Sequence, residues 1–308
     1  MKRALFTTLD THPSVQTSVA ARYDAFVRHV TVADALGFDA FWVGEHHGTN
    51  VGRIPNPAVL LAAAAAKTRR IRLGPAVSVL PLRPPRLVAE DYAMLDALSG
   101  GRLDMGVGVG SQRVEFEHLG VDFDQRRALF DAHLDELERA WETDSGPDKP
   151  PLYVATLSEE GAFRVGKAGR SMLTLVSPAV RDLDEIERRL RAHARGLEEH
   201  GGAANADAVV MVFACAAANE REARLRASRS LGNFIELSSG TRPDDPVALC
   251  DAMRQRGTGL FASREQMTAR VDALVRRGFE NLCFFVDFGT MEANAVEETM
   301  RSLAPSCL

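Results

Sequence analysis

The segment FWVGEHHGTN, residues 41–50, sets a carboxylate and two adjacent imidazoles, those of Glu45, His46 and His47, at the end of an apolar run. These groups exchange protons near neutral pH and are common in acid–base sites. Two histidines also suggest a metal, but histidine ligands on one element need a spacing that aims both at one point, such as i and i+4 on a helix. Neighbouring strand residues diverge, so we predict no metal site. We predict a polar site led by His46, with a structural pair of histidines as the alternative.

A second candidate stretch is GVGVGSQ, residues 106–112, where glycines alternate at the end of a predicted strand. It lacks the G-x-G-x-x-G spacing of a dinucleotide-binding turn and the lysine of a phosphate-binding loop. Glycines in a strand indicate that something approaches the backbone closely. A ligand or neighbouring chain is one interpretation and a tight barrel corner is the other, and the sequence favours neither.

Short apolar segments alternate with amphipathic ones along the chain. Eight apolar segments are predicted strands: RALFTT, FDAFWVGEH, IRLGPAVSVL, RLDMGVGVG, PLYVAT, SMLTLV, AVVMVFACAAA and NLCFFVDF. Near-continuous apolar strands are typical of parallel sheets covered on both faces. About eight strand–helix units closing on themselves give a (β/α)₈ TIM barrel, which we predict as a single α/β domain over residues 1–308. An open doubly wound sheet, which needs about five or six units, is the alternative.

The predicted barrel places the opening segment at the active end, because catalytic residues of such barrels lie at the C-terminal ends of strands. Side chains alternate along a strand, so one of His46 and His47 is expected to face the mouth and the other to pack outward or into the following loop. Residues 231–263, with Gly, Ser and Pro throughout, are predicted to be irregular. Long irregular segments in barrels are often functional or disordered, so we expect a lid or substrate wall there, with Phe234, Met253 and Phe261.

Composition excludes several classes of protein. The chain has 308 residues, 45% of them hydrophobic, and a formal net charge of −5, which offers no basic surface for nucleic acid. Its four cysteines are far apart and form no Cys-x-x-Cys pair, which is typical of thiols in a reducing compartment. No segment approaches the ~20 apolar residues of a membrane helix, and MKRALFTTLD is predicted to be a strand rather than a signal peptide. We therefore expect a soluble, cytoplasmic protein.

Three quoted stretches together resemble the bacterial luciferase-like flavin-dependent monooxygenase family: FWVGEHH, the long stretch from NPAVLLAAAAAKT to EHLGVDF, and NLCFFVDFGTMEANAVEETMRSLA. The resemblance is dense over residues 38–124 and looser elsewhere. It implies a (β/α)₈ barrel that binds reduced FMN at its C-terminal mouth. Oxygen would then give a flavin C4a-hydroperoxide that oxygenates a small organic substrate, with the reduced FMN supplied by a separate flavin reductase. A homodimer through the second and third predicted helices is also implied.

The resemblance assigns roles to individual residues near the flavin ring. His46 matches the family's active-site histidine and is expected to act in acid–base or proton-positioning chemistry, with Glu45 orienting it. Ala76 and Val77 fall on the family's cis peptide beneath the isoalloxazine ring. These four positions are expected to lie next to the flavin ring.

Five further positions concern the rest of the flavin. Gly110 and Ser111 are expected to offer backbone N–H groups, and Ser158 matches a phosphate-binding serine at a helix N-terminus. The chain departs from the family at Val109, where an arginine holds the phosphate, and at Gly161, where a threonine does. Loss of a charge-assisted contact should weaken phosphate binding.

These departures leave alternatives. Arg113 or Arg164 could replace the missing arginine. The flavin could instead bind weakly and transiently, or the site could take a different flavin. A deazaflavin coenzyme used for hydride transfer is one rival, and a non-catalytic flavin-binding relative is another.

Overall fold

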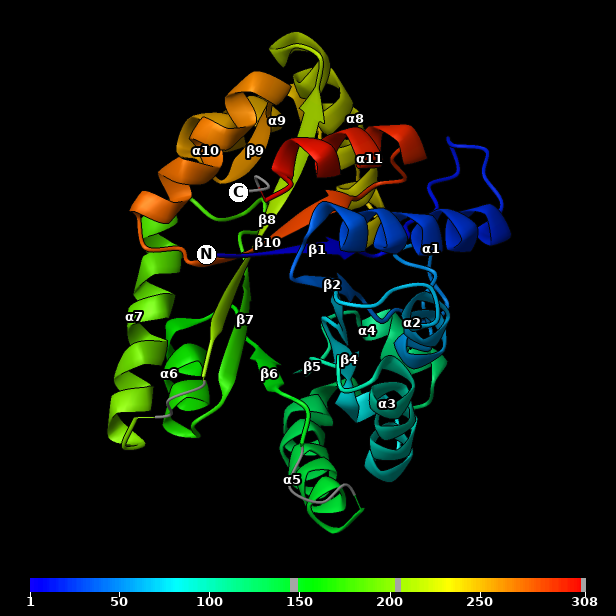
Figure 1. Cartoon of the computed structure of the whole chain (residues 1–308), viewed down its shortest axis with the longest axis vertical. Coiled ribbons are helices and arrows are strands. Elements are labelled where there is room, and N and C mark those ends of the chain that lie inside the picture. The colour runs from blue at the N-terminus through cyan, green and yellow to red at the C-terminus, as the bar shows by residue number, and fades with distance from the viewer. Residues whose placement is uncertain (145–148, 203–205, 306–308) are drawn as a thin grey trace.

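A parallel barrel forms the centre of the computed structural model, which describes residues 1–144, 149–202 and 206–305 (Figure 1). The strands lie in the order β3-β2-β1-β10-β8-β7-β6-β5-β4, and β9 pairs with β8. Their bounds are β1 (Lys2–Thr7), β2 (Ala40–Val43), β3 (Arg72–Pro75), β4 (Ser78–Val79), β5 (Met105–Gly108), β6 (Leu152–Ala155), β7 (Ser171–Leu175), β8 (Ala208–Ala217), β9 (Gly259–Ser263) and β10 (Asn281–Asp287). Leu73 in β3 bridges to Leu103, just before β5, so the two ends of the sheet meet. The predicted barrel is confirmed.

Helices surround the barrel (Figure 1). They are α1 (Val19–Leu36), α2 (Pro57–Ala65), α3 (Pro85–Ser99), α4 (Arg113–His118), α5 (Arg126–Asp144), α6 (Glu159–Lys167), α7 (Leu183–Glu199), α8 (Glu220–Ser239), α9 (Pro246–Arg256), α10 (Arg264–Arg276) and α11 (Ala293–Leu303). Within the described residues, none of these helices has the length and apolar character needed to cross a membrane.

Local sequence explains where several helices begin and end. The side chain of Asn56 accepts a hydrogen bond from the backbone N–H of Val59, and Pro57 occupies the first helical position of α2, where its missing N–H costs nothing. Helix α1 begins after Ser18 and ends at Gly37, whose φ of 83° is left-handed and favours glycine. Strands β2 and β10 are buried along their whole length, as expected for a sheet covered on both faces.

The alternating glycines at the end of β5 are explained by the neighbouring strand. A Cβ at Gly106 would overlap the carbonyl oxygen of Pro75, and one at Gly108 would lie 2.5 Å from Cγ2 of Val77. Gly74, on β3, is likewise blocked by the carbonyl oxygen of Asp104. The glycines therefore allow a tight barrel corner between the β3–β4 stretch and β5.

The prediction of an irregular segment over residues 231–263 is wrong. This stretch holds the end of α8, all of α9 and β9, and β9 pairs with the second half of β8 from Phe213 onward. Gly240 and Gly257 misled the prediction, because they end α8 and α9 in left-handed conformations rather than marking a loop. Phe261 lies in β9 and is fully buried, so it belongs to the core and forms no lid.

Two buried histidines predict the pH dependence of stability. Burial lowers the pKa of His29 and of His193 below the ordinary 6.5. Between the folded-state pKa and 6.5, the unfolded chain therefore binds protons that the folded chain does not. The contribution of these neutral imidazoles to the free energy of unfolding is complete above pH 6.5 and is lost as the pH falls through their folded-state pKa values. We expect the free energy of unfolding to fall between pH 7 and pH 5.5 by up to about 1.4 kcal/mol per pH unit for each imidazole.

Urea denaturation across this range checks the expectation. His29→Gln and His193→Gln should each flatten the pH dependence, whereas substitution of the exposed His200 by Gln should leave it unchanged. An unchanged slope in both core variants would contradict the assignment.

Candidate active site

Two acid–histidine pairs lie at the C-terminal end of β2. Nδ1 of His46 lies 2.8 Å from Oε1 of Glu115, and the same oxygen accepts a hydrogen bond from the backbone N–H of His47 at 3.3 Å. The side chain of His47 turns instead to Glu45, with Nε2 to Oε1 at 2.9 Å. Both acids are buried. The expectation that Glu45 orients His46 is therefore wrong, because Glu115 on α4 contacts that imidazole.

His46 keeps one nitrogen available. Its side chain is 19% exposed, against 2% for Glu115, and Nε2 has no hydrogen-bond partner among the described residues. A carboxylate at Nδ1 fixes the orientation of the ring and favours a proton on Nδ1, which leaves Nε2 free to exchange a proton with a ligand. No group of three or more His, Cys, Asp or Glu able to hold a metal occurs within the described residues.

Glu45 ties two strands together. Its Oε2 accepts hydrogen bonds from Oγ of Ser78 at 3.0 Å and from the backbone N–H of Val79 at 3.3 Å. Both donors lie in β4, directly after the peptide bond between Ala76 and Val77, which is cis as predicted. Glu45 thereby fixes the position of this peptide relative to the end of β2. Ala76 and Val77 are half-buried and remain partly accessible.

The loop after β5 offers backbone donors beside this peptide. Gly110 has a left-handed φ of 82°, and a Cβ there would lie 2.7 Å from Cγ1 of Val79. Among the described residues, no group accepts a hydrogen bond from the backbone N–H of Gly110 or Ser111. Ser111 is exposed and Val109 is half-buried. Within the described residues, the loop therefore presents N–H groups without a protein acceptor.

The predicted phosphate site at the start of α6 (the α6 cradle) already has hydrogen-bond partners within the protein. Oγ of Ser158 accepts a hydrogen bond from the backbone N–H of Gly161 at 3.1 Å and caps α6. A Cβ at Gly161 would overlap Oγ1 of Thr156, so a threonine cannot occupy position 161 without a shift. Two acids, Glu159 and Glu160, lie in the first turn of the helix. Negative charge at this end disfavours a phosphate.

The two candidate replacement arginines have other partners. Arg113 donates to Asp124 at 2.9 Å and its guanidinium lies 4.4 Å from the centre of the Phe123 ring. Arg164 faces Asp131 at 3.9 Å and its side chain is 67% exposed. Neither contacts Ser158 in this structure, so neither restores the missing cation.

The C-terminal half of α8 extends across part of the mouth. Asn233 donates to the carbonyl oxygen of Gly289, after β10, and Ser238 accepts from the side chain of Gln112, after β5. Phe234, predicted as part of a wall, is half-buried, and its ring centre lies 5.4 Å from that of Phe213. Helix α8 therefore forms one wall of the mouth.

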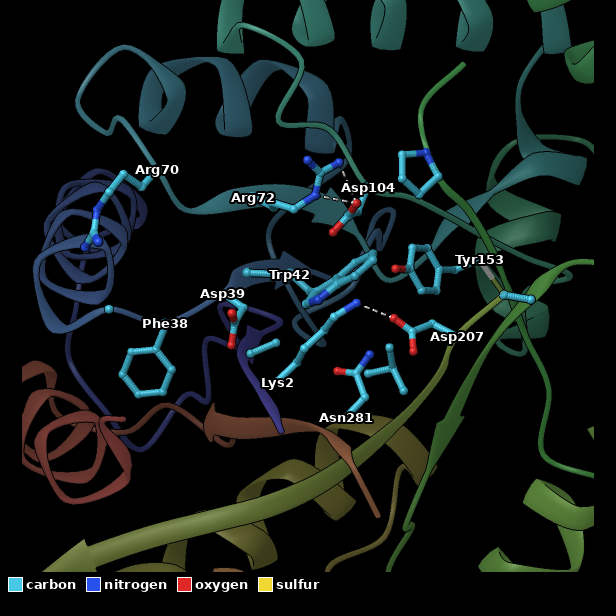
Figure 2. Close-up of a pocket in the computed structure, with 16 residues that line it drawn as sticks. Lys2, Phe38, Asp39, Trp42, Arg70, Arg72, Asp104, Tyr153, Asp207 and Asn281 are labelled. Atoms are coloured by element: carbon cyan, nitrogen blue, oxygen red, sulfur yellow. Dashed lines mark hydrogen bonds and ion pairs between the residues drawn. The ribbon is translucent and has the colours of Figure 1, made fainter. Parts of the chain in front are cut away.

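A cavity of about 670 Å³ lies at the opposite end of the barrel (Figure 2). Two ion pairs lie in it, Lys2 with Asp207 at 2.5 Å and Arg72 with Asp104 at 2.7 Å. The lining residues lie at the N-terminal ends of the strands, an end that contributes to stability rather than to chemistry in such barrels. We therefore place the candidate active site at the C-terminal mouth rather than at this cavity.

Sequence reasoning missed Glu115. It lies in the short stretch RVEFEH, where Glu115 and Glu117 both look like solvated helix residues. Glu115 is 1% exposed, next to the fully buried Phe116. Its partner, His46, is 69 residues away in the sequence, and no local sequence pattern predicts a contact over that separation.

Known proteins resemble this chain in sequence. Residues 1–283 match the family model described as luciferase-like monooxygenase. The oxygenase component of the flavin-dependent trigonelline monooxygenase of Acinetobacter baylyi is 23% identical over 94% of this chain and 90% of its own length. An uncharacterised protein of Sinorhizobium fredii is 31% identical over 47% of each chain, so the match spans about half the length of that curated relative.

Solved structures share the fold. The monooxygenase RslO1 of Streptomyces bottropensis has a TM-score of 0.87 at 23% identity, over 99% of this chain and 98% of its own. The oxygenating constituent of 3,6-diketocamphane monooxygenase of Pseudomonas putida, in complex with FMN, has a TM-score of 0.74 at 18% identity, over 100% and 99%. An F420-dependent secondary alcohol dehydrogenase has a TM-score of 0.74 at 16% identity, over 98% and 97%.

Proposed function

Since the chain belongs to the luciferase-like monooxygenase family, we propose that it is a flavin-dependent monooxygenase that uses reduced FMN and O₂ to place one oxygen atom in a small organic substrate. The observation that carries the proposal is the imidazole of His46, held at Nδ1 by Glu115 with Nε2 free, at the C-terminal mouth of the barrel. Catalytic groups of such barrels lie at this end.

The residues at the mouth fit the ring of a flavin. Ala76 and Val77 offer a partly accessible apolar surface, and the free N–H groups of Gly110 and Ser111 suit the polar edge of such a ring. When bound, the reduced flavin supplies the activation of oxygen. The chain supplies the rest: Glu45 fixes the β4 surface, Glu115 orients His46, and His46 holds or moves a proton at Nε2.

A separate flavin reductase is the proposed source of reduced FMN. The support is the trigonelline monooxygenase relative, whose name describes an oxygenase component. A deazaflavin oxidoreductase is the second candidate, because an F420-dependent dehydrogenase shares the fold. The weak phosphate cradle at Ser158 also leaves room for a coenzyme whose tail is held elsewhere.

The proposed location is the cytoplasm. Cys215, Cys250 and Cys283 are buried free thiols, which suits a reducing compartment. Cys307, the fourth predicted thiol, lies outside the described residues.

A homodimer is proposed through α2 and α3. Four large apolar side chains are exposed on these helices: Val59 (69%), Leu87 (51%), Met94 (62%) and Leu98 (63%). The three on α3 are seven and four residues apart, which is about two helical turns and then one, so they lie on the same side of the helix. Several large apolar side chains exposed on one side of neighbouring helices are typical of an interface.

Rapid mixing with photoreduced FMN and air tests the oxygenase proposal. The protein should give a transient flavin absorbance that is absent with FMN alone. His46→Ala should shorten the life of this transient by on the order of 100-fold, because proton control is lost, while FMN affinity changes by less than about threefold. Glu115→Gln should give a smaller loss, and His200→Gln none.

Failure of the protein to bind reduced FMN, or an unchanged transient in His46→Ala, would overturn the assignment. A change in deazaflavin fluorescence on binding, with no oxygen-dependent transient, would select the second candidate.

The phosphate of FMN should contribute little to binding. Equilibrium fluorescence titrations should give oxidised FMN and riboflavin affinities within about threefold, and Val109→Arg should tighten FMN alone by about tenfold, because one charge-assisted contact is restored. Leu225→Arg, on the exposed surface of α8, adds the same charge elsewhere and serves as the control. A strong FMN preference in the unmodified protein would contradict the structure of the α6 cradle.

Sedimentation should report a dimer that Met94→Glu dissociates. A carboxylate at this 62%-exposed position would be trapped without a partner in the interface. Leu225→Glu, 49% exposed on α8, should leave the mass unchanged. A monomeric unmodified protein would refute the proposed interface.

A further inference from the structure

A buried carboxylate joins three loops at the mouth of the barrel. Asp10, which follows β1, is fully buried. Its Oδ1 accepts hydrogen bonds from the hydroxyl of Thr8 at 2.7 Å and from the backbone N–H of Gly52 at 2.9 Å. Its Oδ2 accepts from the backbone N–H of Gly289 at 2.7 Å. The loops after β1, β2 and β10 are therefore tied to one side chain.

One of these loops supports the imidazole of His46. A Cβ at Gly52 would lie 2.8 Å from Cδ2 and 3.2 Å from Cβ of His46, so the bare backbone of Gly52 packs against this side chain. Gly52 has a left-handed φ of 69°. Its position depends on the hydrogen bond to Asp10, and a shift of this loop would release one side of the imidazole. Glu115 holds the ring at Nδ1.

The backbone around Asp10 is held in uncommon conformations. Leu9 and Thr290 are the two non-glycine residues with a positive φ within the described part of the chain, at 55° and 64°. The hydroxyl of Thr290 donates to the carbonyl oxygen of Asp10 at 3.0 Å and accepts from the backbone N–H of His12 at 2.6 Å. Such conformations persist only where surrounding contacts over-determine them, and they gather at functional sites.

The groups around Asp10 act on the pKa of its carboxyl in opposite directions. Burial has the largest effect and raises the pKa of the Asp10 carboxyl, the hydrogen bonds from Gly289 and Thr8 lower it, and Asp287 and His46 raise and lower it by smaller amounts. Asp287 is neutralised by Arg22, which contacts both of its oxygens at 2.9 Å. Within the described residues, no Lys or Arg forms an ion pair with Asp10. The charge of Asp10 is therefore stabilised by the hydrogen bonds from Thr8, Gly52 and Gly289.

We propose that Asp10 is a positioning residue for His46. It holds the Gly52 backbone against the imidazole, while Glu115 fixes Nδ1. The role of His46 in turnover rests on the proposed function, but its positioning by Asp10 can be measured in the protein alone.

Asp10→Asn tests the proposal. The amide keeps the shape but must direct its NH₂ group at a backbone N–H donor, so at least one loop hydrogen bond is lost together with the charge. The ring resonances of His46, identified in ¹H–¹⁵N spectra by their loss in His46→Gln, should move at constant pH. The transient formed with photoreduced FMN and air should be shortened by about tenfold, with FMN affinity changed by less than about threefold.

Asp34→Asn is the matched control. Asp34 also accepts three backbone hydrogen bonds, from Arg69, Arg70 and Ile71, and ties α1 to the start of β3 at the opposite end of the barrel. We expect this variant to lower Tm without moving the resonances of His46.

Thr8→Val removes one hydrogen bond to Asp10 at nearly constant shape, and serves if Asp10→Asn does not fold. It should move the His46 resonances in the same direction by a smaller amount. Unmoved His46 resonances in folded Asp10→Asn or in Thr8→Val, or an equal movement in Asp34→Asn, would overturn the proposal. Absence of any oxygen chemistry in the unmodified protein would refute the proposed function and leave the spectroscopic result to decide the role of Asp10.

Discussion

Buried carboxylates bind the loops of this barrel to one another at its mouth. Removing a carboxylate from water is costly, and the cost is offset only when several donors surround it. Glu45 meets this condition with donors from β4 and from His47, and Glu115 meets it with donors from two successive residues after β2. Each acid therefore specifies a relative placement of two chain segments. The active-site geometry results from these cross-links more than from any single strand.

Much of this architecture could be predicted from local sequence. The cap at Asn56 and the start of a helix at Ser158 depend on a side-chain oxygen reaching an N–H three residues later, so the sequence contains both partners. Strand positions followed from continuous apolar runs. The cis peptide at Ala76 was predicted by family resemblance rather than by pattern.

The partners of the site could not be predicted in this way. Glu115 and Asp10 act on residues that are distant in sequence, and a carboxylate in a polar stretch looks the same whether it is buried or solvated. Glycines led to a different error. Gly240 and Gly257 each end a helix, whereas the glycines in this stretch suggested an irregular segment. Gly106 was ambiguous for the same reason, because its missing side chain could serve a ligand or a neighbouring strand equally well.

The tight corner between the β3–β4 stretch and β5 limits which substitutions this barrel can accept. Gly74, Gly106 and Gly108 each lack room for even a methyl group, because the facing backbone or Val77 already occupies the space. Single substitutions there would displace the strand that carries Ala76 and Val77, the proposed flavin-binding surface. New specificities, in nature or in a directed-evolution library, must therefore arise elsewhere around the rim, such as the surface of α8 near Phe234, where change leaves the corner intact.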